Sequence, residues 1–165
     1  MKVGAGSKIH ATAKIVEEGH KILIGQNCLI GDFAFIAARI LVMEDMSQIS
    51  PHAIIGGGGE VRLGKYSVVG FGAILIPATD SPSGRFMCEA KSEEERDIVR
   101  GSITLGQGAY VGSGAVICIS KKCPNIKIGE NAVVGALSYI DESVAANTIT
   151  RPFMKYHTTL RRVVK

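Results

Sequence analysis

The sequence lacks the features of several common protein classes. Among its 165 residues there is no tryptophan and only 5% are aromatic, which excludes a core built from large rings. No apolar run approaches the roughly 18 residues of a membrane-spanning helix. The first ten residues, MKVGAGSKIH, lack the apolar centre of a signal peptide. We therefore expect no membrane partner.

The cysteines, histidines and charged residues are not spaced in the patterns of a metal site, a disulfide framework or a nucleic-acid-binding surface either. The four cysteines have no C-x-x-C spacing, so neither a zinc site nor a disulfide framework is expected, and unpatterned cysteines fit a reducing cytoplasm. The histidines are scattered, so we expect no metal. The formal net charge is only +4, without a stripe of basic and aromatic residues, so we expect no nucleic acid.

A six-residue repeat is the dominant pattern. It is clearest in Ile103–Ile117, ITLGQGAYVGSGAVI, where Leu105, Val111 and Ile117 lie six apart and small residues follow the first two. This period is neither the 3.6 of a helix nor the alternation of a two-sided strand. It is typical of a hexapeptide-repeat parallel β-helix, in which three flat faces close a triangular coil. The 20 glycines and the abundant Val, Ile and Ala suit its narrow interior.

The same period can be followed along most of the chain. Shifts of phase between the runs indicate corner loops. The runs are Val3, Ile9 and Ile15; Ile24, Ile30, Ile36 and Val42; Ile49, Ile55 and Val61; Leu63, Val69 and Leu75; Leu105, Val111 and Ile117; and Ile128, Val134 and Ile140.

A shorter motif marks one position of the coil on successive turns. It is an apolar pair separated by one residue and followed by glycine, and it occurs at Ile22–Gly25, Val61–Gly64, Ile103–Gly106 and Ile126–Gly129. Leu63 and Leu105 are 42 residues apart, 24 more than one coil of 18. That excess predicts an inserted loop at 78–101, and an excess of 5 before Ile128 predicts a smaller loop, Ser120–Pro124. Long excursions on uniform scaffolds usually carry function.

The remaining segments complete a single domain over 1–165. After Asn147 the period stops, and we expect 148–165, a basic stretch, to cap the open coil edge. We expect 92–97 to be a solvated helical turn within the loop. Gly56–Gly59 precedes a strand rather than opening a helix, so it is not a P-loop but a corner where no side chain fits.

These features resemble the left-handed β-helix acyltransferases, the hexapeptide acetyltransferase superfamily. The resemblance rests on the repeat, on one long loop before GSITLGQGAYVGSGAVI, and on IGENAVVGALS followed by a basic tail. Within the superfamily the chain is most similar to enzymes that N-acetylate nucleotide-linked 4-amino-4,6-dideoxy sugars for O-antigen and related glycans. That similarity rests on Thr79–Met87, on Gly101 before the coil ending VGSGAVI, and on Val134–Ser138.

The resemblance implies an all-β, left-handed parallel β-helix that forms a homotrimer with active sites between subunits. It implies acetyl-CoA as co-substrate and a nucleotide-linked amino sugar as acceptor, in surface glycan or lipopolysaccharide biosynthesis. Orientation alone lowers the barrier to acyl transfer by roughly 7–11 kcal/mol. A base must still take a proton from the acceptor, and backbone N–H groups steady the oxyanion.

Asp80 is the first candidate for the acceptor-side carboxylate, which would hold the sugar amine and take its proton. Thr79, Ser83 and Arg85 of the same loop are the candidate substrate-binding residues. The alternative is that Asp80-Ser81-Pro82 is only a turn. Many O-acetyltransferases of the superfamily carry a histidine where this chain has 78–80, and its absence weighs against an O-acetyl acceptor.

His52 is the second candidate base, because histidine alone has an unperturbed pKa near neutrality. It would act in an O-acetyltransferase of a sugar or small molecule. The alternative is a histidine that packs at a subunit interface or does nothing. A third possibility, of another class, is a non-catalytic β-helix scaffold.

The resemblance places coenzyme A in a groove between subunits near the C-terminal coils. The matching positions are Ser113 and Ala136 beside Gly112 and Gly135, where small side chains let backbone approach the ligand. The alternative is that the coil itself needs small residues there. Lys155, Arg161 and Arg162 are candidates for the coenzyme phosphates, or else a solvated basic tail. The family's Gly-x-Pro-Ala-Lys tail segment is absent.

Overall fold

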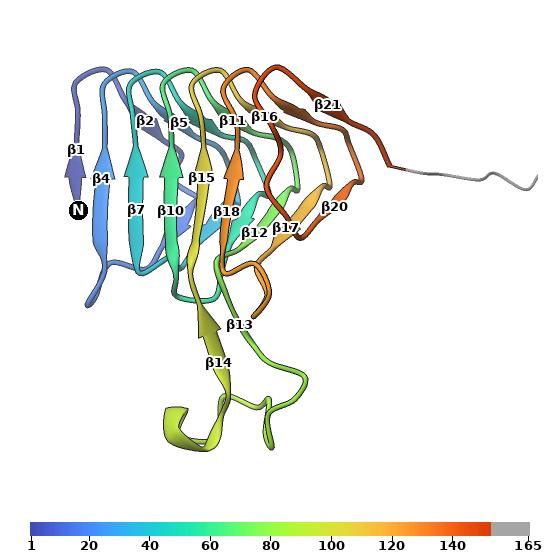
Figure 1. Cartoon of the computed structure of the whole chain (residues 1–165). Coiled ribbons are helices and arrows are strands. Elements are labelled where there is room, and N and C mark those ends of the chain that lie inside the picture. Colours follow the sequence, from blue (N-terminus) through green and yellow to red (C-terminus); the bar gives the residue numbers. More distant parts are fainter. Residues whose placement is uncertain (153–165) are drawn as a thin grey trace, which may run out of the picture.

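The six-residue period builds three parallel β-sheets that form the three faces of one continuous coil (Figure 1). The computed structural model describes residues 1–152. Within them, each turn adds one short strand to each face, and strands of successive turns pair in parallel. The protein is therefore a parallel β-helix, as the sequence predicts.

The first face contains the longest strands, and the second face has one strand more than the others. The first face is formed by β1 (Lys2–Val3), β4 (Lys21–Ile24), β7 (Ile40–Met43), β10 (Glu60–Leu63), β15 (Ser102–Leu105) and β18 (Asn125–Ile128). The second face is formed by β2 (Lys8–Ile9), β5 (Leu29–Ile30), β8 (Gln48–Ile49), β11 (Val68–Val69), β16 (Tyr110–Val111), β19 (Val133–Val134) and β21 (Ile149–Thr150). The third face is formed by β3 (Lys14–Ile15), β6 (Phe35–Ile36), β9 (Ile54–Ile55), β12 (Ile74–Ile76), β17 (Val116–Cys118) and β20 (Tyr139–Ile140).

One aliphatic side chain per short strand points into the coil and stacks on its counterparts. On the third face Ile36, Ile55, Leu75 and Ile117 are fully buried in successive turns. Burying such a side chain contributes roughly 1.5–3 kcal/mol. A ladder of branched aliphatics fills this narrow interior, which explains the lack of tryptophan.

The four-residue strands of the first face confirm that the apolar-x-apolar motif marks one coil position. Ile24, Leu63, Leu105 and Ile128 lie in one register, with Met43 between the first two. The expected inward position of Val42 is wrong, because the longer strand buries the residues on either side of it, Leu41 and Met43. Leu41-Val42-Met43 is a fifth copy of the motif, and it was hidden because Glu44 follows it instead of glycine.

The three corners of the coil differ in construction. The first corner (between first and second faces) and the second corner (between second and third faces) are tight turns, most of which contain one left-handed residue. At the second corner of successive turns these residues are Phe33, His52, Gly72, Gly114 and Leu137, all with φ between 57° and 66°. Such a φ costs an L-residue with a side chain roughly 1–2 kcal/mol. The third corner, between third and first faces, holds the insertions.

The protruding loop at 78–101 is confirmed and leaves the third corner after β12. Its two antiparallel strands, β13 (Ala78–Asp80) and β14 (Ile98–Arg100), form a hairpin that extends away from the coil (Figure 1). A short 3-10 turn, η1 (Glu93–Glu95), lies in the predicted helical stretch. A Cβ added at Gly57 or Gly59 would lie 2.1 or 2.0 Å from the carbonyl oxygens of Ala78 and Pro77. The glycine corner therefore lets the hairpin leave the coil.

The predicted cap, 148–165, begins as part of the coil. Ile149 and Thr150 pair with Val133 and Val134, so the strands continue past Asn147. The rest of that segment, from 153 to 165, lies outside the described residues. None of the helical segments within 1–152 is long and apolar enough to cross a membrane.

Candidate functional site

The hairpin holds Asp80 in a two-point ion pair. Arg96 donates from Nε to Asp80 Oδ1 at 3.1 Å and from Nη2 to Oδ2 at 2.9 Å. Only 14% of the Arg96 side chain and 10% of the Asp80 side chain is exposed. The hydrogen bonds that Arg96 donates to Asp80 raise the pKa of Arg96. Asp80 thus has a fixed orientation, and any substrate amine must share its carboxylate with Arg96.

The predicted substrate residues lie further along the same hairpin. The Ser83 hydroxyl contacts that of Ser81 at 2.7 Å and donates to Asp97 at 3.4 Å. Thr79 Oγ1 donates to the Asp80 carbonyl at 3.4 Å. Arg85 is exposed, and its guanidinium lies 5.1 Å from the centre of the Phe86 ring. Thr79 lines a pocket with Asp80, Ser83 and Arg85 lie further along the hairpin, and the role of all three in binding stays a prediction.

Asp97 and Lys121 form a contact that sequence reasoning missed. Lys121 belongs to the confirmed smaller loop, Ser120–Pro124, where the Ser120 amide donates to the Cys123 carbonyl at 3.1 Å. Its ammonium pairs with Asp97 and reaches Ser83 Oγ at 3.3 Å. The hydrogen bond from Lys121 lowers the pKa of Asp97. The loops at 78–101 and Ser120–Pro124 both leave the coil at the third corner. This shared position in the repeat could have predicted from the sequence that the two loops touch.

His52 lies at the second corner, away from the hairpin. Its ring stacks on Phe33 with centroids 5.1 Å apart, and its backbone amide donates to the Asp32 carbonyl at 2.9 Å. The Asp32 carboxylate accepts hydrogen bonds from His10 and Thr12, and the bond from Thr12 is the main cause that lowers its pKa. His52 and Asp80 therefore occupy different corners of one chain.

The predicted coenzyme residues share the second corner with His52, nearer the C-terminal end. The Leu137 amide donates to the Ser113 carbonyl at 3.0 Å, which stacks Ala136 over Ser113. A Cβ added at Gly112 would lie 2.4 Å from the Ala136 amide nitrogen, and one at Gly135 would lie 2.7 Å from the Thr150 oxygen. The coil itself thus requires both glycines, and their role toward coenzyme A stays a prediction. Lys155, Arg161 and Arg162 lie outside the described residues.

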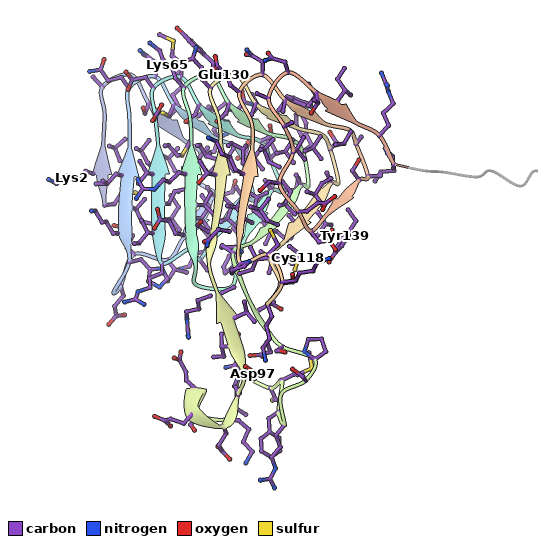
Figure 2. All side chains as sticks on the ribbon, in the orientation of Figure 1. Lys2, Lys65, Asp97, Cys118, Glu130 and Tyr139 are labelled. Atoms are coloured by element: carbon purple, nitrogen blue, oxygen red, sulfur yellow. The ribbon has the colours of Figure 1, made fainter. Side chains whose placement is uncertain are left out.

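The outer surfaces of the second and third faces carry apolar side chains that the sequence reading did not use. On the third face Phe35, Ile54, Ile74, Val116 and Tyr139 lie in one register and point outward. Phe35 and Tyr139 are 41% and 65% exposed, and Figure 2 shows Tyr139 on the outside of the coil. The adjoining second corner exposes Phe33, Phe71 and Leu137. Contiguous apolar patches of this kind mark interaction surfaces.

The candidate residues include no evident metal centre. Over residues 1–152, no group of three or more His, Cys, Asp or Glu side chains is placed to hold a metal ion. The site residues of the two corners are carboxylate, hydroxyl, guanidinium and imidazole groups. These can orient an acceptor, bind anions and move a proton.

Comparison with known proteins gives a consistent result. No protein-family model matches the chain. It is 26% identical over 131 residues to a dTDP-4-amino-4,6-dideoxy-D-glucose acyltransferase of Escherichia coli, a match that covers 78% of this chain and 66% of the relative. The chain thus spans just under two thirds of that relative's length.

Solved structures extend the likeness to nearly the whole chain. A point mutant of AntD, an N-acyltransferase from Bacillus cereus, in complex with dTDP-4-amino-4,6-dideoxyglucose and coenzyme A matches with a TM-score of 0.80 and 25% identity, over 97% of this chain and 84% of AntD. A hexapeptide-repeat acetyltransferase from Vibrio cholerae matches with a TM-score of 0.52 and 16% identity, over 90% of this chain and 66% of its own, which shows the fold alone.

The fold and these likenesses confirm the relationship to the β-helix acyltransferases. The Escherichia coli relative and AntD are both acyltransferases, which is the class of enzyme that the sequence predicts. Within that class, the chain is related to the N-acyltransferases of amino sugars.

Proposed function

We propose that this protein transfers an acyl group from an acyl-coenzyme A to the amino group of a nucleotide-linked amino-deoxysugar. The observation that carries the proposal is the likeness to AntD, which spans 97% of the chain and includes a structure with dTDP-4-amino-4,6-dideoxyglucose and coenzyme A. A hairpin with a fixed carboxylate, Asp80, supports the same reaction.

The chemistry places simple demands on the hairpin. The amine nitrogen bonds to the thioester carbonyl carbon, the carbon–sulfur bond breaks, and the amine loses a proton. A carboxylate offers about four acceptor positions, and Arg96 takes two of them. Asp80 can therefore accept a charge-assisted hydrogen bond from the amine while Arg96 holds it, and can take the proton as the new bond forms.

We propose a homotrimer with the acceptor and coenzyme sites completed between subunits. Within one chain, Asp80 lies in the third-corner hairpin while Ser113 and Ala136 lie at the second corner. A neighbouring copy seated on the apolar third face and second corner can bring its hairpin to these residues. The exposed Phe33, Phe35 and Tyr139 support this arrangement, because neighbouring exposed apolar side chains mark interaction surfaces.

We propose acetyl as the acyl group and a cytoplasmic step of surface glycan or lipopolysaccharide biosynthesis as the setting. The acyl group needs its own test, because another structure of AntD contains dTDP and 3-hydroxybutyryl-CoA. That structure is 26% identical to this chain and matches over 90% of this chain and 76% of AntD. Rates with acetyl-CoA and 3-hydroxybutyryl-CoA, measured side by side, decide between the two donors. The free cysteines of the described chain support a reducing compartment.

Mass spectrometry of the acceptor tests the function directly. Purified protein, acetyl-CoA and dTDP- or UDP-linked amino sugars should give an acetylated amino sugar and free coenzyme A. The reaction with a hydroxyl sugar in place of the amine is the control. Turnover only with the hydroxyl acceptor would favour the second candidate function, an O-acetyltransferase with His52 as base.

The O-acetyltransferase alternative is kept because the His52 ring is stacked at the corner that carries Ser113 and Ala136. The scaffold alternative predicts no ligand at all. Saturating coenzyme A should raise the melting temperature of a working transferase by mass action. An unchanged melting temperature would favour the scaffold.

A further inference from the structure

Two arginines at the third corner and one on the adjoining first face lie beside the hairpin. Arg39 precedes β7, Arg62 points outward from β10, and Arg100 ends β14. They come together because neighbouring strands lie about 4.8 Å apart and the coil register places these segments in adjacent turns. The arginines line one cavity of about 510 Å³, whose other polar lining side chains are Glu60, Ser102, Thr104 and Asn125.

Gly58 and Gly59 of the glycine corner also line this cavity. The amides of Gly57, Gly58 and Gly59 donate no hydrogen bond within the described part of the chain. Gly57 and Gly58 have φ of 86° and 73°, and a Cβ at Gly58 would meet no atom within 4 Å. Successive free amides in a turn form a concave site for anions. The corner is not a P-loop, but it carries donors of the same kind.

A histidine faces the same region. His20 shares a pocket of about 430 Å³ with Arg39, Arg100 and Gly58. Its Nδ1 is buried and has no hydrogen-bond partner among the described residues. The His20 ring therefore adds an imidazole to the wall formed by Arg39 and Arg100.

The arginines are available to a ligand. Arg39 forms no ion pair within residues 1–152. Arg62 pairs with Glu60 and Arg100 with Glu93, but the two arginine side chains are 52% and 40% exposed. Exposed ion pairs are weak because water screens them. A phosphate oxygen can therefore replace either carboxylate, and guanidinium groups bind phosphate in a two-point geometry.

We propose that this corner binds the diphosphate of the nucleotide-linked substrate, with Arg39 and Arg100 as its main contacts. The inference rests on the proposed function for the identity of the ligand. Arg100 and Gly58 also line the adjacent pocket of about 440 Å³ that contains Thr79, Asp80 and Arg96. A diphosphate held by Arg39 and Arg100 thus leaves the sugar beside Asp80. Because Asp80, the proposed partner of the acceptor amine, lines that pocket, the nucleotide sugar is favoured over coenzyme A as the source of the phosphates.

Binding measurements on matched variants test the site. Inorganic pyrophosphate, dTDP and coenzyme A are titrated into the assembled protein by calorimetry. Arg39→Gln and Arg100→Gln should each weaken pyrophosphate and dTDP by about tenfold, the loss of one charge-assisted contact, and leave coenzyme A unchanged. Lys65→Gln makes the same change of charge at the first corner, remote from the hairpin (Figure 2), and should change none of the three. Glu93→Gln should tighten pyrophosphate, because it removes the competing carboxylate.

Two results overturn the inference. In one, both arginine variants bind pyrophosphate and dTDP like Lys65→Gln. In the other, they weaken coenzyme A alone, which makes the coenzyme the source of the phosphates. Melting curves of all variants, with Arg39→Lys as a milder change, separate lost binding from lost folding. Arginine-dependent dTDP binding without acyl transfer would defeat the proposed function but not this site. Acyl transfer with wild-type dTDP binding in both arginine variants would defeat the site alone.

Discussion

Arg96 binds both carboxylate oxygens of Asp80 within the hairpin. The same carboxylate is the proposed partner of the substrate amine. Its orientation is therefore set before substrate arrives, which is what acyl transfer by positioning requires.

Replacing Asp80 separates its two roles. Asp80→Asn keeps the shape but removes the charge, so acyl transfer should fall by about 100-fold or more, with the coenzyme A affinity unchanged. Arg96→Lys keeps a charge beside Asp80 without the two-point contact and should lose less activity. Steady-state rates with an amino sugar, together with melting curves, measure both effects. Full activity of a folded Asp80→Asn protein would make Asp80 a hairpin anchor only.

His52 offers a test that distinguishes catalysis from backbone conformation. Its φ of 59° suits glycine, so His52→Gly should be more stable than His52→Ala by about 1 kcal/mol. Both variants lack the ring and should keep N-acyl transfer if Asp80 is the base. Denaturant unfolding and turnover check the two expectations. Loss of turnover in both variants, with folding intact, would assign the base to His52.

Neighbouring residues of β9 separate interior from surface. Ile55 is fully buried, and Ile55→Ala should lower the free energy of unfolding by about 2–5 kcal/mol. Ile54 is 39% exposed on the outer side of the same strand, so Ile54→Ala should lower the free energy of unfolding far less than Ile55→Ala does. Equal losses for the two variants would contradict the inward and outward assignment.

The apolar outer side of the third face predicts self-association. Phe35→Glu should shift the mass measured by light scattering from a trimer toward a monomer, because it places a charge in the proposed interface. Lys127→Glu introduces the same residue on the polar first face and should leave the mass unchanged. A monomeric parent protein would refute the homotrimer.

Lys121 predicts how Asp97 titrates. The hydrogen bond from Lys121 lowers the pKa of Asp97 below its ordinary value of 3.8. Because the pKa of Asp97 is lowered in the folded state, its ion pair stabilises the folded protein at a pH above the ordinary pKa. This contribution to stability is lost as the pH falls through the pKa of the folded state. Lys121→Met should therefore raise the Asp97 pKa, as measured by NMR titration of its carboxyl carbon. An identical titration curve in the variant would show that the contact does not form in solution.

The spacing of apolar residues was enough to predict the coil, because each turn needs the same inward-facing residues at the same positions. One aliphatic residue per face must enter a narrow interior, so Leu105, Val111 and Ile117 reveal the fold without knowledge of distant residues. The inserted loop was equally visible as a break in that spacing. The error at Val42 arose because turns of 19 and 20 residues, from Ile24 to Met43 and from Met43 to Leu63, depart from the ideal of 18.

The sequence by itself thus determined the β-helix, the position of its long loop, and the candidacy of Asp80. Only the tertiary structure decided that His52 and Asp80 lie at different corners, that Arg96 orients Asp80, and that Lys121 reaches Asp97. It also decided that Arg39, Arg62 and Arg100 meet beside free glycine amides. The physical reason is that a repeat period depends on each residue's own neighbours, whereas corner contacts depend on the accumulated length of every turn between them.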